Sequence, residues 1–462
     1  MLRIFAGLRH AHFIGIGGVG MSGIAEVLLD YDLEVSGCDL SRGETTRRLE
    51  GLGVTIHQGH GGDHLDGVDL VVKSSAVGED NPEIVAARER GITVVRRAEM
   101  LAELMRLKYG IAVAGTHGKT TTTSLVGTML TEAGLDPTVI VGGRMRVSGT
   151  GARIGSSDYL VAEADEYDRS FLRLMPILAV ITCIDRDHLD TYGGLDAIRE
   201  AFVEFADRVP FFGQIILCLD DPNVQEILPR LATKHRVVTY GLSPQADLSA
   251  HDLRPTPEGS RFTVNGSGGP LGEVAVPIPG LHNVRNTLAA VAVGRAVGLE
   301  FERIASALAS FRGVHRRFER VGQWLGAAVV DDYAHHPTEV AATLQAARQA
   351  FPGARLHAVF QPHLYSRTRD LCEDFARALL EADDAVVTGI YASRESPIAG
   401  VSGEDIVRAA RQSGHRRVEY CADWRQVPQT LRERIGDDDV VITMGAGDIY
   451  RLARQLSEEA ER

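Results

Sequence analysis

A glycine-rich turn between an apolar strand and a helix constrains this chain most. Residues 111–123 read IAVAGTHGKTTTT, and apolar residues at helical spacing follow as far as Gly134. Backbone amides in such a turn can surround phosphate oxygens, the Lys119 ammonium can neutralise them, and the Thr120 hydroxyl can ligate Mg²⁺. The turn therefore predicts an ATP site built from Gly115, Thr116, His117, Gly118, Lys119, Thr120 and Thr121.

The turn departs from the usual GxxxxGK[ST] pattern, because Val113 occupies the place of the first glycine and Gly115 begins a shorter loop. The alternative is a structural loop that merely caps a helix. That alternative leaves Lys119 unexplained, since a helix N-terminus disfavours a cation unless an anion lies there.

Composition restricts the partners of the chain. Its 462 residues allow two to four domains, and 49 basic against 62 acidic residues give a formal charge of −13. We therefore expect neither nucleic acid nor a membrane as a partner. The five cysteines are scattered without a CxxC pair, so neither a disulfide scaffold nor a structural zinc site is expected, and a cytoplasmic location fits best.

Strand-like apolar runs alternate with helix-like stretches along the whole chain. This alternation predicts an α/β fold with mainly parallel sheets. We divide the chain into three domains, at residues 1–106, 107–313 and 314–462.

A second glycine turn occurs near the N-terminus. Residues 12–23 contain Gly15, Gly17 and Gly20 in GxGxxG spacing, and Asp39 follows a second short strand. Such a turn lets backbone amides approach a pyrophosphate, and the acid suits a ribose. A dinucleotide, a UDP-sugar, or a tight turn without a ligand all remain compatible with this pattern.

Acidic residues follow two strand-like runs of the middle region. Residues 159–162 lead into Glu163 and the rest of EADEYD, and residues 177–184 lead into DRDHLD at 185–190. Ligands bind beyond the carboxyl ends of parallel strands, so an Mg²⁺ site with Glu163 as its best ligand is expected. Asp165, Asp168, Asp187 and Asp190 could equally be helix caps or surface charges, and His188 alone would be an unusual ligand.

Several long motifs occur together in one order. They are GTHGKTTTT at 115–123, EADEYD at 163–168, DRDHLDTY at 185–192, HNVRN at 282–286, HRRFE at 315–319 and DDYAHHPTEV at 331–340. On these motifs the chain resembles the Mur ligase family over essentially its whole length. The resemblance implies a Rossmann-like UDP-sugar domain, a central ATPase-like domain, and a Rossmann-like C-terminal domain that closes on ATP and the amino acid.

The resemblance also implies roles for individual residues. Thr120, Glu163 and His188 would hold Mg²⁺, and Asn283, Asn286 and Arg317 would contact ATP. As a structural alternative, Asn283 and Asn286 would be the N-cap and N3 residues of a helix from Val284. The UDP-sugar would lie on Gly15, Gly17, Gly18, Gly20, Asp39 and Ser74.

Within the family, GIGGVGMSGIAE at 15–26 resembles the branch that adds L-alanine to UDP-N-acetylmuramate through an acyl phosphate, in peptidoglycan precursor synthesis. A branch that attaches an intact tripeptide is the nearest alternative. Residues 189–213 contain no lysine, so we expect no carbamylated lysine at the metal. A monomer or a homodimer is expected.

The last domain carries candidates for the amino-acid site. A strand at 327–330 is followed by DDYAHHP, with Pro337 near the start of a helix, and a strand at 356–360 is followed by His363 and Arg367. Arg367 could hold the alanine carboxylate, and His335 or His336 could accept a proton. Each could instead be a structural surface residue, and MGAGDIY at 444–450 is interpreted as a structural turn.

Two other functions remain as alternatives. An NAD-dependent oxidoreductase would use only the first glycine turn, and an ATP-gated switch protein would hydrolyse ATP without an amine substrate.

Overall fold

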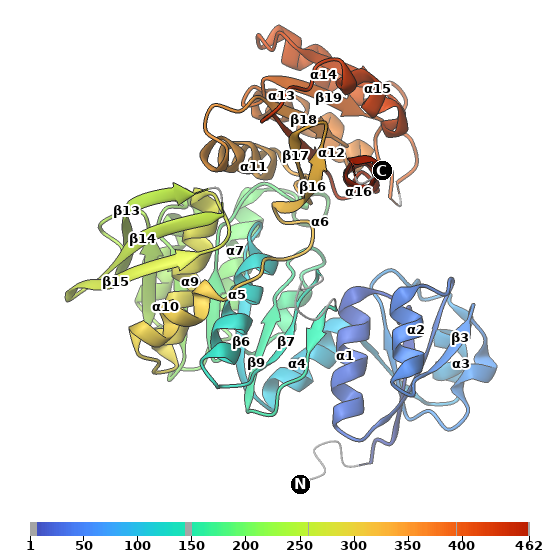
Figure 1. The fold of residues 1–462 in the computed structure, drawn as a ribbon. Helices are drawn as coiled ribbons and strands as arrows, with labels where there is room; N and C mark the ends of the chain where they lie inside the picture. The colour runs from blue at the N-terminus through green and yellow to red at the C-terminus, as the bar shows by residue number, and fades with distance from the viewer. Residues whose placement is uncertain (1–6, 144–149, 257, 394, 461–462) are drawn as a thin grey trace. The chain divides into compact units, whose positions relative to one another are not determined.

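The computed structural model describes residues 7–143, 150–256, 258–393 and 395–460. The described chain is α/β and contains three sheets (Figure 1). It forms two compact units. The first comprises Met1–His251, Thr263–Val274 and Arg285–Val314, and the second comprises Asp252–Phe262, Ala275–Val284 and His315–Arg462.

The N-terminal sheet is fully parallel, with the order β3-β2-β1-β4-β5. Its central strand continues into the first glycine turn, so this turn lies at the point where the strand order reverses. Helices α1, α2 and α4 cover one face of the sheet, while η1 and α3 cover the other. The elements are β1 (His10–Ile14), α1 (Val19–Asp30), β2 (Glu34–Asp39), α2 (Glu44–Gly51), β3 (Thr55–Gln58), η1 (Gly62–Leu65), β4 (Leu70–Lys73), α3 (Pro82–Glu89), β5 (Thr93–Arg96) and α4 (Arg97–Arg106).

The central sheet has ten strands in the order β15-β14-β13-β12-β11-β10-β6-β9-β7-β8. Strand β6 (Tyr109–Ala114) pairs in parallel with β9 (Tyr159–Glu163) on one side and with β10 (Leu178–Ile181) on the other. Helix α5 (Lys119–Glu132) follows the phosphate turn, and Gly134, at φ +76°, lies just beyond its end as predicted.

The remaining elements of this region are β7 (Thr138–Ile140), β8 (Ala152–Arg153), η2 (Ser170–Arg173), α6 (Leu189–Tyr192), α7 (Leu195–Ala206), β11 (Gln214–Cys218), α8 (Pro222–Ala232), β12 (Val237–Gly241), β13 (Leu248–Thr256), β14 (Gly259–Gly266), β15 (Gly269–Val276), α9 (Leu281–Ala296) and α10 (Phe301–Ala309).

Three expected boundaries in this region are wrong. Strand β10 ends at Ile181 rather than at 184, because the next residues bond to the phosphate turn instead of a neighbouring strand. Glu163 is the last residue of β9 rather than the first beyond it. Helix α9 begins at Leu281, so Asn283 lies inside its first turn and is not its N-cap.

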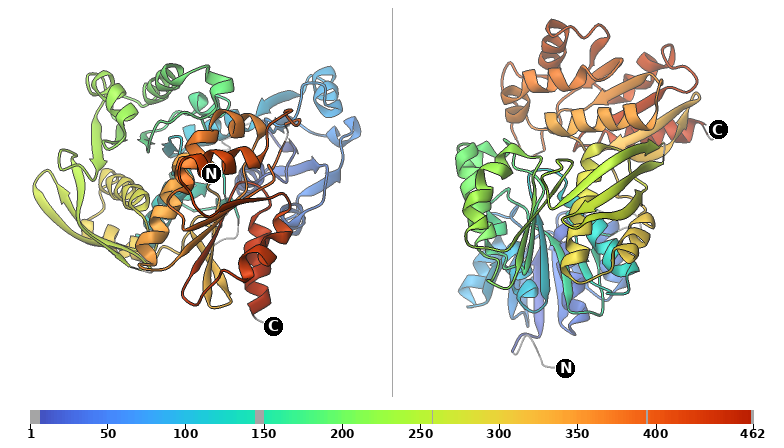
Figure 2. Two further views of the ribbon diagram at one scale, coloured as in Figure 1. Left: turned by 90° about the horizontal axis from the view of Figure 1, so that it is seen from above. Right: turned by 90° about the vertical axis from the view of Figure 1, so that its left-hand side faces the viewer.

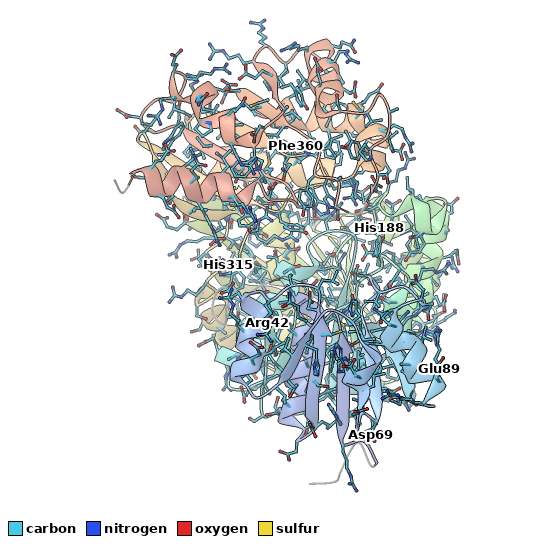
Figure 3. All side chains as sticks on the ribbon, turned by 90° about the vertical axis from the view of Figure 1, so that its right-hand side faces the viewer. Arg42, Asp69, Glu89, His188, His315 and Phe360 are labelled. Carbon is cyan, nitrogen blue, oxygen red and sulfur yellow. The ribbon has the colours of Figure 1, made fainter. Side chains whose placement is uncertain are left out.

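The C-terminal sheet has the order β16-β17-β21-β18-β19-β20, in which only β16 is antiparallel to its neighbour. Helices α11, α13 and α14 pack on one face, where Phe360 (labelled in Figure 3) meets Phe375. Helices α15 and α16 pack on the other face (Figure 2). The elements are β16 (Glu319–Trp324), β17 (Ala327–Asp332), α11 (Pro337–Ala350), β18 (Leu356–Phe360), α12 (Tyr365–Asp370), α13 (Cys372–Leu379), β19 (Asp384–Thr388), α14 (Gly403–Gln412), β20 (Val418–Cys421), η3 (Trp424–Gln426), α15 (Val427–Arg432), β21 (Val440–Met444) and α16 (Tyr450–Ala460).

All five cysteines are free thiols, in agreement with the sequence-based prediction. Across the described ranges, none of the helices has both the length and the apolar character needed to cross a bilayer.

Candidate functional site

The phosphate turn follows the carboxyl end of β6, with acidic segments on both sides. Glu163 ends β9, and the chain after β10 leads through Asp185 to His188, which is labelled in Figure 3. Because the three strands are parallel, their carboxyl ends meet at one edge of the sheet. The structure therefore brings these sequence-predicted groups together.

Two glycines of the turn cannot be replaced without a clash. Gly115 has φ +129°, and a Cβ there would lie 2.0 Å from Oγ1 of Thr182. Gly118 has φ +83°, and its Cβ would lie 2.7 Å from Oδ1 of Asn286. The second contact also places Asn286, on α9, directly beside the predicted phosphate site.

The segment after β10 fixes the shape of the turn. The Thr116 amide donates to the Cys183 carbonyl (3.0 Å), and the Asp185 amide donates to Oγ1 of Thr116 (2.9 Å). Nε2 of His117 lies 3.1 Å from Oδ2 of Asp185. These bonds hold the turn open in a defined shape, which is the preorganisation that phosphate binding needs.

Lys119 is held by a carboxylate that the sequence analysis did not single out. Its ammonium donates to both oxygens of Glu166 (2.9 and 2.8 Å) and to the Gly115 carbonyl (2.8 Å). Burial alone would lower the pKa of Lys119, but the carboxylates of Glu166 and Asp165 outweigh burial and raise it. Lys119 is therefore a buried cation. The only sequence signal for Glu166 was its place within EADEYD.

Thr120 and Glu163 face a turn that has no side chains. A Cβ on Gly142 would lie 2.9 Å from Oε2 of Glu163, and a Cβ on Gly143 would lie 3.0 Å from Cγ2 of Thr120. Glycines at these two positions let the backbone approach the Glu163 carboxylate and the Thr120 side chain closely, and the carboxylate and hydroxyl that these residues carry are oxygen donors of the kind that Mg²⁺ prefers. These residues fit the predicted metal ion.

His188 lies close to the same acids. Its Nε2 is 4.0 Å from Oε1 of Glu166 and 3.7 Å from Oδ2 of Asp187, and its ring meets Tyr167 edge-on. With φ +54° it adopts the left-handed conformation, a strained state that is enriched at functional sites.

The other acids of these motifs make local turn contacts. Asp165 accepts from the Tyr167 amide (3.2 Å) and Asp168 from the Ser170 amide (3.0 Å). Oδ1 of Asp187 accepts from the His188 amide (2.9 Å). These are turn contacts, and none of the three residues is the N-cap of a helix, because Arg169 and His188 occupy the N-cap positions of η2 and α6. The Asp190 side chain lies outside the described part.

The first glycine turn is assembled at the carboxyl edge of the N-terminal sheet. Oδ2 of Asp39 accepts from the Gly17 amide (2.9 Å), and Cβ of Ser74 lies 3.3 Å from the position of a Cβ on Gly15. Gly18 is the N-cap of α1. The structure therefore gathers the predicted UDP-sugar residues. Asp39 bonds to the turn itself, a contact that its predicted role at a ribose did not include.

Arg97 was missed by the sequence analysis. A Cβ on Gly20 would lie 3.3 Å from Nη1 of Arg97, so this guanidinium lies over the amino end of α1. A cation beside a glycine turn suits a pyrophosphate. A lone arginine at a helix start gave no recognisable signal in the sequence.

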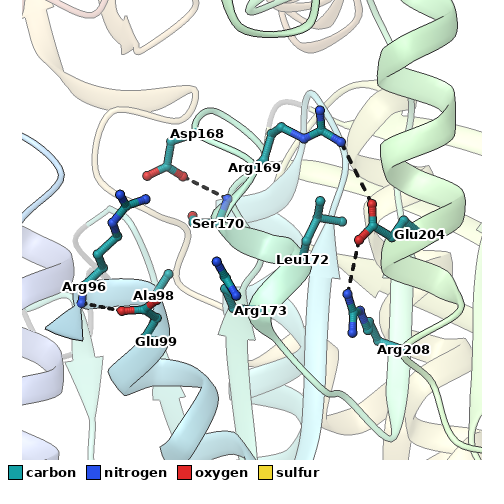
Figure 4. Close-up of a pocket in the computed structure, with 10 residues that line it drawn as sticks. All are labelled: Arg96, Ala98, Glu99, Asp168, Arg169, Ser170, Leu172, Arg173, Glu204 and Arg208. Atoms are coloured by element: carbon teal, nitrogen blue, oxygen red, sulfur yellow. Dashed lines mark hydrogen bonds and ion pairs between the residues drawn. The ribbon is translucent and has the colours of Figure 1, made fainter.

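A basic cavity of about 340 Å³ lies beside EADEYD, as Figure 4 shows. Four arginines and three acids line it. Glu204 pairs with Arg208 (3.1 Å) and approaches Arg169 (3.9 Å). The balance of charge favours an anion. The lining residues are Arg96, Ala98, Glu99, Asp168, Arg169, Ser170, Leu172, Arg173, Glu204 and Arg208.

In the second unit, the predicted histidines differ in their surroundings. His336 is buried and is the N-cap of α11, where its Nδ1 accepts from the Thr338 amide (3.4 Å). His335 is only partly buried, and its ring meets that of His363 edge-on at 5.7 Å between centroids. Nη1 of Arg367 lies 3.4 Å from Nδ1 of His363. His335, His363 and Arg367 thus form one group.

Arg317 and Asn283 also belong to this unit. The Arg317 guanidinium lies over the Tyr333 ring and 3.8 Å from Glu339. Nδ2 of Asn283 donates to the Pro279 carbonyl (2.7 Å). The predicted structural turn at 444–450 bonds to Arg316, which donates to the carbonyls of Gly445 and Gly447.

Three family profiles match consecutive stretches of the chain. The profile described as Mur ligase family, catalytic domain, matches residues 10–109. The Mur ligase middle domain matches residues 113–294, and the Mur ligase, glutamate ligase domain, matches residues 316–447.

Curated relatives match over almost the full length. A UDP-N-acetylmuramate–L-alanine ligase from Sorangium cellulosum is 52% identical over 98% of this chain and 97% of its own length. One from Salinibacter ruber is 51% identical over 98% of this chain and 95% of its own length.

Solved structures of similar ligases match the fold of this chain over nearly its full length. The UDP-N-acetylmuramate–alanine ligase from Thermotoga maritima gives a TM-score of 0.82 at 30% identity, covering 98% of this chain and 99% of that one. A murein peptide ligase from Psychrobacter arcticus gives a TM-score of 0.68 at 25% identity, covering 97% and 98%. With its phosphate turn, its acidic strand ends and three matching profiles in order, the chain belongs to the Mur ligase family.

Proposed function

We propose that this chain is an ATP-dependent ligase that joins L-alanine to the carboxylate of UDP-N-acetylmuramate in the cytoplasm, as a step of peptidoglycan precursor synthesis. The observation that carries the proposal is the turn at Lys119, set between the carboxyl ends of two acidic strands. Relatives that share about half of the sequence over nearly the whole chain bear the name of this reaction.

Each predicted domain has one task in this proposal. Residues 1–106 bind the UDP-sugar through the first glycine turn, with Arg97 beside the pyrophosphate. Residues 107–313 bind ATP, and residues 314–462 supply the amino-acid site. The basic cavity beside EADEYD adds positive charge in the unit that contains both turns, which suits anionic substrates.

A carboxylate does not acylate an amine unaided, so ATP must first convert it into an acyl phosphate. The sugar carboxylate attacks the γ-phosphorus and ADP leaves, while Lys119 turns from Glu166 to the phosphoryl oxygens and offsets their charge. Thr120, Glu163 and His188 would hold Mg²⁺, which neutralises charge on the transferred phosphoryl group when bound.

The amine of L-alanine then attacks the acyl carbon, and phosphate leaves. We assign the amine proton to His335 rather than His336, because the imidazole of His336 already caps α11. Arg367, beside His363, binds the alanine carboxylate.

A single assay tests the reaction. ADP release is measured with UDP-N-acetylmuramate and a panel of free amino acids, and with the tripeptide in place of an amino acid. We expect release only with the sugar nucleotide and L-alanine together. ADP release without any amine would identify a switch protein, and preference for the tripeptide would identify the other branch.

Variants then test the site. Lys119→Ala and His188→Ala should abolish alanine-dependent ADP release while UDP-sugar binding stays nearly intact. Near-normal turnover in either variant would remove the role assigned to that residue. A nicotinamide-fluorescence titration should show no binding, which separates this proposal from an oxidoreductase.

A further inference from the structure

One face of the N-terminal sheet buries polar side chains next to its apolar cluster. Along β1 and β2, the alternate residues His10, His12, Ser36 and Cys38 point toward η1 and α3 and are almost inaccessible to solvent. The opposite face carries apolar residues such as Phe13. Burial of polar groups costs free energy unless they find partners, so this layer needs an explanation that the ATP and UDP-sugar sites do not provide.

The polar layer converges on Glu83 of α3, whose side chain is fully buried. Its Oε2 lies 2.9 Å from Sγ of Cys38 and 3.1 Å from Nδ1 of His60, and these two atoms are 3.2 Å apart. Its Oε1 lies 2.6 Å from Nδ1 of His64 and 3.4 Å from Nε2 of His12. A thiol, a carboxylate and three imidazoles thus surround one point.

His12 is oriented toward this point by a neighbour. Its Nδ1 bonds to Oγ of Ser36 (2.8 Å), and its buried Nε2 is directed at the Glu83 carboxylate, 3.4 Å from Oε1. Histidines that bind a metal through one ring nitrogen usually bond to a neighbouring polar group through the other, and His12 has this arrangement. The bond from Ser36, which lies outside the cluster, thus fixes the orientation of the His12 ring toward Glu83.

The ligand atoms of Cys38, His60 and Glu83 lie 2.9–3.2 Å apart, so a small tetrahedral ion would replace their hydrogen bonds and move them apart by a few tenths of an ångström. Ligand atoms about 2.0–2.3 Å from a zinc ion are about 3.3–3.8 Å from each other. The ligand atoms of His12, Cys38 and Glu83 all lie within 4.8 Å of one another. Mixed sulfur, nitrogen and oxygen donors favour Zn²⁺ over Mg²⁺, which binds oxygen.

We propose that the N-terminal part of this chain contains a second metal site, in which His12, Cys38, His60 and Glu83 bind one Zn²⁺ and His64 bonds to the Glu83 carboxylate. Binding converts the Cys38 thiol into a thiolate and releases one proton to solvent. The thiolate and the carboxylate then balance the charge of the ion, while both imidazoles stay neutral. The sequence analysis expected no structural zinc site, because these ligands are spread over residues 12–83.

The location gives this site a consequence. The Cys38 carbonyl accepts from the amides of Gly15 and Ile16 (2.9 and 3.0 Å), which begin the first glycine turn. An ion bound to the Cys38 side chain would therefore fix the position of the residue whose carbonyl bonds to the start of this turn. The ion would tie β1, β2, η1 and α3 into one rigid support.

The test uses the full chain without a histidine tag, stripped with a chelator and kept in excess Mg²⁺ so that the oxygen site near Thr120 is saturated. Zn²⁺ is titrated, and retained metal is measured by mass spectrometry. Co²⁺ is then substituted, because a thiolate ligand gives it a charge-transfer absorption in the near ultraviolet. We expect one ion per chain and the thiolate absorption.

Variants locate the ion. Cys38→Ser should remove the thiolate absorption, and Glu83→Gln should weaken Zn²⁺ binding at least about tenfold. Cys372→Ser, a cysteine of the second unit, is the matched control and should change neither. Circular dichroism checks that each variant is folded.

Two outcomes would overturn the proposal, and both can be read without relying on a Cys38 variant. The first is that the wild-type chain retains no Zn²⁺ after desalting at micromolar free ion. The second is that the thiolate absorption disappears in Cys183→Ser, which would place the ion beside the phosphate turn, where Cys183 lies.

Discussion

Lys119 and Glu166 form a buried ion pair at the centre of the proposed ATP site. Burial raises the pKa of Glu166, and Lys119 opposes that rise. Removing one member of such a pair leaves the other charge buried without its partner, whereas replacing both by apolar groups is far less costly.

We therefore predict that Glu166→Leu lowers the melting temperature on the order of 5–10 °C, because the buried ammonium loses its counter-charge. Addition of Mg²⁺ and a non-hydrolysable ATP analogue should restore more stability to this variant than to the wild type. Thermal melts of Glu166→Leu, Lys119→Met and the double variant check this. If the two single losses simply add in the double variant, the pair is not coupled.

The phosphate turn allows a sharper test at Gly118. Gly118 and Gly298 share almost the same conformation, with φ +83° and +84°, but a Cβ has open space only at Gly298. Gly298→Ala should cost about 1 kcal/mol of backbone strain and leave turnover unchanged. Gly118→Ala adds the clash with Asn286 and should raise the KM for ATP at least about tenfold. Equal kinetics in both variants would contradict the clash.

Individual contacts were the least predictable part of the site. EADEYD indicated acids near the phosphates, yet which acid pairs with Lys119 depends on how the chain turns after β9. Arg97 and Gly20 lie far apart in the sequence, and their approach depends on the packing of α4 against α1. Periodicity carries no information about either contact.

At the scale of elements, the sequence predicted the strands and helices that have a strong hydrophobic pattern. Strand β18, helix α5 and the Pro337 start of α11 were placed well. The predicted ends of strands were wrong where a contact outside the regular pattern between strands decides where the strand stops. After Ile181 the chain bonds to the phosphate turn, and Asp331 and Asp332 extend β17 beyond its apolar residues.

Asp332 gives the extended strand a pH dependence. Burial raises its pKa to about 6, although Arg317 and the amides of Phe318 and Ala334 lower it. A carboxyl whose folded pKa is raised above its unfolded value of about 3.9 stabilises most at low pH, and this contribution is lost as the pH rises through 6.

We predict that Asp332→Asn removes this dependence. Between pH 5 and pH 7.5 the wild type should lose about 1.4 kcal/mol of stability relative to the variant, from the two pKa values given above. Urea unfolding of both proteins at the two pH values measures the difference. A gap that stays constant with pH would show that Asp332 does not titrate in this range.

At the scale of the whole molecule, the sequence predicted three α/β domains, and three sheets are present. The chain groups into two compact units, and the first unit contains both glycine turns. Core residues from the N-terminal and central sheets belong to one apolar cluster. Composition changes little along the chain, so the domain bounds 1–106, 107–313 and 314–462 stay a prediction.

The two glycine turns should be separable by mutation although they share a unit. Arg97→Ala is expected to raise the Kd for UDP-N-acetylmuramate at least about tenfold and leave Mg-nucleotide binding intact, because its guanidinium lies at the first turn. Lys119→Ala should do the reverse. Calorimetric titration of each variant with each ligand measures both effects. Loss of both ligands in either variant would mean that the turns act as one site.

Glu166 already binds the Lys119 ammonium, so an incoming anion must displace this carboxylate. A carboxylate tethered a few ångströms away acts at a very high effective concentration. Inorganic phosphate and sulfate carry about as much net charge as a triphosphate with its Mg²⁺, but they bring no cation for the displaced carboxylate. A triphosphate that arrives with Mg²⁺ can replace Glu166 at the ammonium while its metal offers the acidic strand ends a counter-charge. The turn is therefore expected to select the metal–nucleotide complex over a free anion of similar net charge.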